Sequence, residues 1–154
     1  MLDPDSIRTL AKSLNREVWD LLAVAGRSAE QAQQMIHAAH ASCRLWLDVG
    51  AGLNQQRGEW LIAHVYTVLG HAEPALRHAE RCMLLTERHR DEMEDFDLAY
   101  AHEGLARAAA LSGNRELAAA NKRRSRELGD LIADAEDKQI FDGDYSGGDW
   151  HGVE

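Results

Sequence analysis

The fold of this chain is decided by residues 57–82, RGEWLIAHVYTVLGHAEPALRHAERC. Apolar residues recur at helical spacing on both sides of Gly70, and Pro74 suits the first turn of a following helix. The stretch therefore predicts two helices joined by a tight turn, since a glycine commonly ends a helix by adopting a left-handed conformation. Polar and aromatic side chains form a second row beside the apolar one, and their role is the open functional question.

The sequence before this stretch repeats the same organisation. Asp3 and Pro4 suit the start of a first helix, which we expect to stop at Gly26. Ser28 predicts the start of a second helix that runs to about residue 50. Asn54 is expected to cap the helix that ends at Gly70. The first half of the chain thus predicts a hairpin of two helices and the start of another.

The sequence after residue 82 begins with a charged segment, 86–97, which we interpret as a helix end followed by a loop. A fifth helix is expected over about 96–112, and Asn114 predicts a sixth that runs to about residue 138. The segment 141–154 is acidic and rich in glycine, so we expect a mobile tail there. The prediction is an all-α helical domain over 1–140, with about six helices in three antiparallel hairpins, and a tail over 141–154.

Composition narrows the functional classes. The net charge is −9 and no block of lysine or arginine occurs, which argues against a nucleic-acid partner. No apolar run approaches the length of a membrane span, and the N-terminus lacks the pattern of a signal peptide. Cys43 and Cys82 lie inside helical patterns and are expected to be buried thiols. We therefore expect a cytoplasmic protein with no membrane partner.

An internal repeat links the two halves around Gly70 and Gly113, which lie 43 residues apart. Small residues precede each glycine by seven positions, at Ala63 and Ala106, and others follow it by five, at Ala75 and Ala118. Small residues at such positions let two helices approach closely. This pattern resembles the tetratricopeptide repeat (TPR), and the resemblance covers residues 57–129 and, as a helical hairpin only, residues 7–48. It implies a right-handed array of hairpins and a role in binding a protein or peptide.

In arrays of this kind the first helix of each hairpin lines a concave groove. The inward positions lie thirteen, ten and six residues before the turn glycine, and each set forms one stripe on its helix. The six candidate groove residues are Arg57, Trp60, His64, Tyr100, Glu103 and Arg107. Arginine suits the recognition of carboxylates or phosphates because its donors form a fork, and the aromatic residues offer flat apolar contact. These residues predict a binding groove, although Glu103 and Arg107 also have the spacing of a simple surface ion pair.

Two other classes of function remain open. An enzyme would use His64 and Glu103 as acid and base, with the arginines holding an anionic substrate. A structural homodimer would stack Trp19 or Trp46 across a two-fold axis. No nucleophile motif, phosphate loop or dinucleotide fingerprint occurs, and His37 and His40 have no apparent third partner for a metal. We therefore expect neither a cofactor nor a metal site.

Overall fold

The structure is a computed structural model that describes residues 2–154, and over these residues it is 80% helical with no strands. The predicted all-α class is confirmed, with one helix more than the six expected from the sequence. The helices are α1 (Pro4–Leu22), α2 (Ala29–Val49), α3 (Gly52–Val68), α4 (Ala72–Arg88), α5 (Asp95–Leu111), α6 (Arg115–Asp130) and α7 (Ala135–Ser146), with a 3-10 turn η1 (Arg90–Glu92) before α5. No helix in this part of the chain has both the length and the apolar character needed to cross a membrane.

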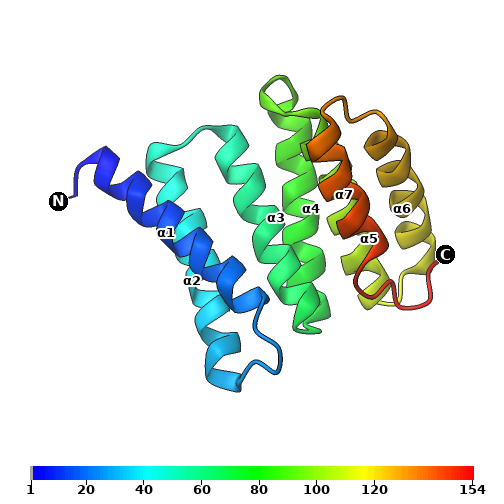
Figure 1. Cartoon of the computed structure of the whole chain (residues 1–154), viewed down its shortest axis with the longest axis horizontal. Coiled ribbons are helices and arrows are strands. Elements are labelled where there is room, and N and C mark those ends of the chain that lie inside the picture. The colour runs from blue at the N-terminus through cyan, green and yellow to red at the C-terminus, as the bar shows by residue number, and fades with distance from the viewer. Residues whose placement is uncertain (1) are drawn as a thin grey trace.

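The helices pack as consecutive hairpins. Helix α1 packs on α2, α3 on α4 and α5 on α6, while α2 with α3 and α4 with α5 join each hairpin to the next. Figure 1 shows this row from the N-terminus at one end to α6 and the C-terminus at the other. Helix α3 also contacts α5, and α7 packs against both α5 and α6. One face of the row is therefore formed by α1, α3 and α5, with α7 added at its C-terminal end.

The turns of the second and third hairpins have the same geometry. Gly70 and Gly113 have φ of +77° and +80°, the left-handed region that favours glycine. The amide of His71 donates to the carbonyl of Tyr66 at 2.9 Å, and the amide of Asn114 donates to that of Ala109 at 2.9 Å. These equivalent bonds satisfy the last carbonyls of α3 and α5. Both helices therefore end as the sequence predicted.

Small residues fill the interior of these two hairpins. Ala63 and Ala75 pack together with Ala79 in one cluster, and Ala118 belongs to the cluster beside it. All of them, and Ala106 as well, are at most 1% exposed. Alanine brings the helix backbones close while it costs little side-chain entropy. The small residues singled out in the sequence therefore lie where helices pack closely.

One helix boundary differs from that expected. Helix α3 begins at Gly52 and not after Asn54, whose side chain instead accepts a hydrogen bond of 3.0 Å from the amide of Ala51. The charged segment 86–97 contains the end of α4 at Arg88 and a connection before α5 at Asp95, as expected, and the 3-10 turn η1 forms part of that connection. Polar side chains bond the backbone at the start of both α3 and α5.

The single helix expected from Asn114 to about residue 138 is wrong, since α6 ends at Asp130 and α7 begins at Ala135. Asp134 caps α7 by accepting a hydrogen bond of 2.9 Å from the amide of Asp137. The break turns α7 back onto α5 and α6 and buries Phe141 completely.

The C-terminal segment after α7 folds back along α6, which differs from the mobile tail expected over 141–154. The Trp150 ring lies 4.5 Å from Lys122 Nζ, and that ammonium donates to the carbonyl of Val153 at 2.7 Å. Arg115 donates to the carbonyl of Gly152 at 2.6 Å, and Val153 is only 6% exposed. Residues 141–154 therefore complete the packing of the third hairpin.

The cysteines are buried and unbonded, as the sequence predicted. Burial raises the pKa of the Cys43 thiol to about 12 and raises that of Cys82 as well. Neither thiol is a nucleophile near neutral pH, because the thiolate is the reactive form.

Candidate binding groove

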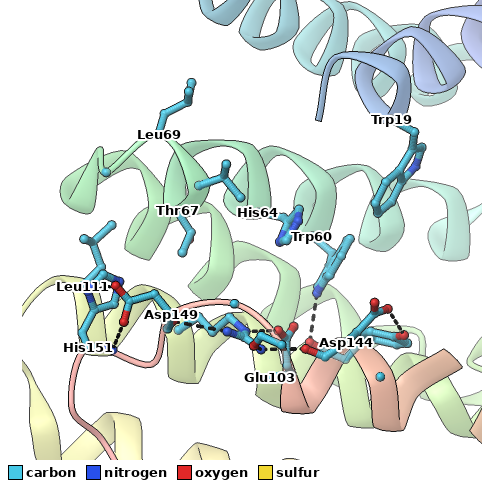
Figure 2. Close-up of a pocket in the computed structure, with 17 residues that line it drawn as sticks. Trp19, Trp60, His64, Thr67, Leu69, Glu103, Leu111, Asp144, Asp149 and His151 are labelled. Atoms are coloured by element: carbon cyan, nitrogen blue, oxygen red, sulfur yellow. Dashed lines mark hydrogen bonds and ion pairs between the residues drawn. The ribbon is translucent and has the colours of Figure 1, made fainter. Parts of the chain in front are cut away.

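A cavity of about 580 Å³ lies between α3, α5 and the C-terminal segment, with Trp19 of α1 at one end (Figure 2). A second hollow of about 350 Å³ adjoins it along α1, α3 and α5. The two share four lining residues and lie side by side, and together we call them the binding groove. The shared residues are Trp19, Trp60, Tyr100 and Asp144.

The six candidate residues from the sequence all border this groove. Trp60, His64, Tyr100, Glu103 and Arg107 line the larger cavity, while Arg57 lines the smaller hollow with Trp60 and Tyr100. The structure therefore brings together the two stripes that the sequence placed 43 residues apart. The free groups that these residues offer to a ligand, however, are not those expected.

One wall of the groove is aromatic. The rings of Trp60 and His64 stack with centroids 4.9 Å apart, and the Trp19 ring lies 6.2 Å from that of Trp60. The indole Nε1 of Trp60 donates to the carbonyl of Tyr100 at 3.0 Å, which holds the ring in place. Trp19 remains 46% exposed at the edge of the groove. The wall thus offers flat apolar surface with little freedom to move.

Trp19 was not among the residues expected in the groove. The connection between α1 and α2 spans residues 23–28, whereas that between α3 and α4 spans only 69–71. Counting back from Gly26 therefore reaches different positions on α1 from those that the same count reaches on α3. The offsets of the inward positions were applied only to Gly70 and Gly113, and they would not have reached Trp19, which lies seven residues before Gly26.

Arg57 does not offer a free guanidinium to the groove. Its Nε and Nη2 both donate to the carboxylate of Asp97 at 2.8 Å, in a two-bond arrangement. The Asp97 side chain is only 5% exposed, so it depends on this partner for its charge. The role of Arg57 is therefore to join α3 to α5.

Arg107 is also fully engaged. Its Nε pairs with the carboxylate of Glu103, and its Nη2 donates to the carbonyls of Asp144 at 2.8 Å and Gly147 at 2.9 Å. Its Nη1 donates to the carbonyl of Asp149 at 3.2 Å. These bonds satisfy carbonyls at the end of α7 that have no partner in the helix. Both groove arginines are therefore engaged within the chain, which argues against the expected role of Arg107 in holding an anionic ligand.

Glu103 presents an unsatisfied polar atom beside the larger cavity, as Gln56 does beside the smaller hollow. One carboxylate oxygen pairs with Arg107, and the other, Oε2, is buried without a hydrogen-bond donor among residues 2–154. Burial raises the pKa of this carboxyl, and the Arg107 guanidinium opposes that rise, as does more weakly the nearby Trp60 indole, whose N–H donates to the Tyr100 carbonyl. The pair is almost fully buried and is not the exposed ion pair that its spacing also allowed. An unpartnered buried acceptor is costly, so a donor supplied by a ligand would stabilise it.

His64 is held in its neutral form. Burial, together with the smaller effect of the Arg107 charge, lowers its pKa to about 4, while the Asp144 charge acts in the opposite direction. His64 and Glu103 line the same cavity from α3 and α5 (Figure 2). The site therefore contains a neutral imidazole and a carboxylate with an open acceptor.

The charges around the larger cavity are mostly negative. Three carboxylates line it, from Glu103, Asp144 and Asp149, against the single guanidinium of Arg107. Asp144 Oδ2 accepts a hydrogen bond of 2.6 Å from the hydroxyl of Tyr100, which leaves its charge at the groove. This surplus of negative charge disfavours an anion and favours a cation.

A second polar cluster lies inside the hairpins, away from the groove. Glu59 Oε2 and His78 Nδ1 are 2.6 Å apart between α3 and α4, and His102 Nδ1 and Asn121 Oδ1 are 2.8 Å apart between α5 and α6. Both pairs span nineteen residues and occupy equivalent places relative to Gly70 and Gly113. Glu59 therefore ties one helix of its hairpin to the other.

No group of three or more His, Cys, Asp or Glu side chains suited to a metal ion occurs in the described part of the chain, residues 2–154. The groove is thus defined by its aromatic wall, its buried carboxylate and its negative charge. Compared with protein-family models, with curated proteins and with solved structures, the chain gave no match.

Proposed function

We propose that this protein is a TPR-like interaction module that binds an extended segment of a peptide or protein in its groove. The observation that carries this proposal is the pair of adjoining hollows of about 580 and 350 Å³ with a wall formed by Trp19, Trp60 and Tyr100. Aromatic residues of this kind are enriched at interfaces, because they combine a large apolar face with a polar edge. A hollow lined by four helices, α1, α3, α5 and α7, suits an extended chain better than a compact small molecule.

Several features support a right-handed TPR-like array. The turns at Gly70 and Gly113 share their hydrogen bonds, and small residues recur at equivalent places in both hairpins. Helices α3 and α5, the first members of successive hairpins, contact each other and border the groove. Two free and buried cysteines fit a cytoplasmic setting, where thiols stay reduced.

An enzyme that uses His64 and Glu103 as acid and base is a second candidate, favoured by their position in one cavity. Its expected anchors for an anionic substrate, Arg57 and Arg107, are bound elsewhere in the chain. A homodimer through Trp19 has less support, since that ring packs against Trp60 in the groove. A second copy of the chain remains within the class of protein partners that we propose.

The proposal is tested by selecting binders from a displayed library of random linear peptides. Enriched peptides should bind the full chain and lose about tenfold in affinity with Trp19→Leu, because exposed aromatic side chains at interfaces often dominate binding. Trp46→Leu is the matched control, since Trp46 lies on α2 and lines neither of the two hollows of the binding groove. The proposal fails if no peptide is enriched, or if the Trp19 and Trp46 variants bind the enriched peptides equally well.

A further inference from the structure

We propose that the larger cavity of the groove takes a cationic side chain, the ammonium of a lysine or the guanidinium of an arginine, presented by the bound segment. This inference rests on the proposed function and names the chemistry that the site would recognise. It reverses the expectation from the sequence, in which two arginines pointed to an anionic ligand. Three independent features of the cavity support it.

The first feature is the open acceptor of Glu103. Its Oε1 already pairs with Arg107, and its Oε2 is buried with no donor among the described residues. Glu103 lines the cavity (Figure 2), and because its Oε2 is itself buried, a donor brought in by a ligand would reach this atom only if a neighbouring side chain moved. A charged donor forms the stronger bond with a carboxylate, because charge-assisted hydrogen bonds are about twice as strong as neutral ones.

The second feature is the balance of charge. Arg107 is the only guanidinium on the cavity wall, and it donates to the carbonyls of Asp144, Gly147 and Asp149 as well as to Glu103. Two further carboxylates, those of Asp144 and Asp149, remain on the wall without a lysine or arginine side-chain partner. An anion in the cavity would meet three carboxylates, whereas a cation would be attracted to them.

The third feature is the aromatic wall. The rings of Trp19 and Trp60 border the cavity, and cations are attracted to the faces of such rings. The chain already uses this contact internally: Arg107 lies 4.0 Å from the centre of the Trp150 ring, and Arg57 lies 5.2 Å from that of Phe96. A lysine or arginine side chain has an apolar stem as well as a charged head, so it fits a site with both apolar and acidic walls.

The probes for this inference are four capped tripeptides, acetyl-Gly-X-Gly-amide, in which X is lysine, arginine, glutamine or glutamate. Each is titrated into the ¹⁵N-labelled full chain while the indole N–H signals of Trp19 and Trp60 are followed, assigned with Trp→Phe variants. We expect the lysine or the arginine peptide to bind about tenfold more tightly than the glutamine peptide, and the glutamate peptide to bind least. The comparison of lysine with arginine identifies the preferred head group.

Three variants locate the effect. Glu103→Gln should remove most of the tenfold preference for the cation, whereas Glu87→Gln should not, since it makes the same change of net charge on an exposed position of α4. Because Glu103→Gln also takes a charged partner from Arg107, Asp144→Asn provides a second route to the same result. Asp144 is exposed, so this variant should fold normally and lose several-fold of the preference.

The outcomes separate the two proposals. The inference is overturned if the glutamine or glutamate peptide binds as tightly as the basic ones, or if no indole signal moves at about 10 mM of the lysine and arginine peptides. Library peptides that bind the groove without a basic residue would also overturn it, while leaving the proposed function intact. Binding of the lysine probe with no capture of any longer segment would sink the proposed function and leave the cation site standing.

Discussion

The hairpins α3–α4 and α5–α6 have the same construction but present different surfaces. Their turns share a left-handed glycine and the same hydrogen bonds, and each holds its helices together through one polar pair nineteen residues apart. The inward positions 43 residues apart are nevertheless occupied by unlike side chains. His64 corresponds to Arg107, and Trp60 corresponds to Glu103.

The difference follows from what packs on each hairpin. Helix α7 and the segment after it cover α5, so Arg107 is buried and satisfies carbonyls of the covering backbone. Trp60 and His64 are only partly buried, with the Trp19 ring beside them, and they line the larger cavity. Residues at equivalent positions of the two hairpins therefore have different roles, because different segments pack on them. The position in the repeat alone does not determine the role.

The largest expected effect comes from Arg107→Ala. The change leaves the Glu103 carboxylate buried without its ion pair and removes the donors to the end of α7. Removing one partner of a buried ion pair costs about 3–5 kcal/mol of the free energy of unfolding, measured by urea denaturation. His64→Ala, at the equivalent position of the other hairpin, should cost only about 1 kcal/mol. If Arg107→Ala and His64→Ala lost similar amounts of unfolding free energy, the two positions would not differ in burial as described.

The next largest effect should be a dependence of the free energy of unfolding on pH, which arises from His64 in the hairpin α3–α4. The pKa of His64 is about 4 in the folded chain, against an ordinary value of 6.5. The unfolded chain therefore binds more protons between these values, and the free energy of unfolding falls as the pH drops from 6.5 toward 4, by up to about 3 kcal/mol.

The measurement for this pH effect compares the wild type with His64→Gln over the same pH range. Burial also lowers the pKa of His40 and raises that of Glu103, but both residues are present in the two proteins. Their contributions cancel in the difference to the extent that the substitution leaves their surroundings unchanged. If the wild type and the variant lose stability in parallel as the pH falls, His64 is not held neutral by burial.

A smaller loss, of about 2 kcal/mol, is expected for Gly129→Ala, because a Cβ atom at this position would overlap the ring of Phe141. Gly143→Ala is the control, since no atom lies within 4 Å of the added Cβ and the position is helical. Thermal unfolding measured by circular dichroism should place Gly129→Ala below the wild type and the control at or above it. Adding Phe141→Leu to Gly129→Ala should recover part of the loss if α7 packs on α6 as described.

The smallest expected losses of unfolding free energy come from the turn glycines, and they should be equal in the two hairpins. Gly70→Ala and Gly113→Ala each place a side chain on a left-handed residue, at φ of +77° and +80°, with no atom within 4 Å of the added Cβ. The strain is expected to cost about 1 kcal/mol in each case. Urea denaturation of the two variants should give losses that agree within error, and clearly unequal losses would show that the turns are not equivalent.

The sequence predicted the hairpins because helix ends are local. Glycines, capping residues and apolar spacing are signals that act within a few residues. The sequence alone therefore predicted the existence of α1 to α5. The break between α6 and α7 was missed because its cap, Asp134, stands in a run of charged residues that also suits a continuous helix. Burial of Phe141 against Gly129 is a long-range contact that no local pattern contains.

The candidate site could be predicted only in part, because its long-range contacts leave no local pattern in the sequence. Helical spacing was enough to place Trp60, His64, Glu103 and Arg107 on one side of their helices, and the structure brings them to one cavity. Spacing could not tell which donors stay available, since that depends on partners far along the chain. Arg57 lies forty residues from Asp97, and Arg107 lies forty from Gly147.

By itself, the sequence determined an all-α chain of hairpins, the places of its tight turns and the identity of the inward side chains, because these depend on local propensity and helical periodicity. Only the tertiary structure decided that the C-terminal segment covers α5 and that the arginines are bound within the chain. The physical reason is that a buried guanidinium takes the nearest carboxylates and carbonyls as partners, and packing alone determines which are near. That packing turned a groove expected to hold an anion into one whose open acceptor and net charge favour a cation.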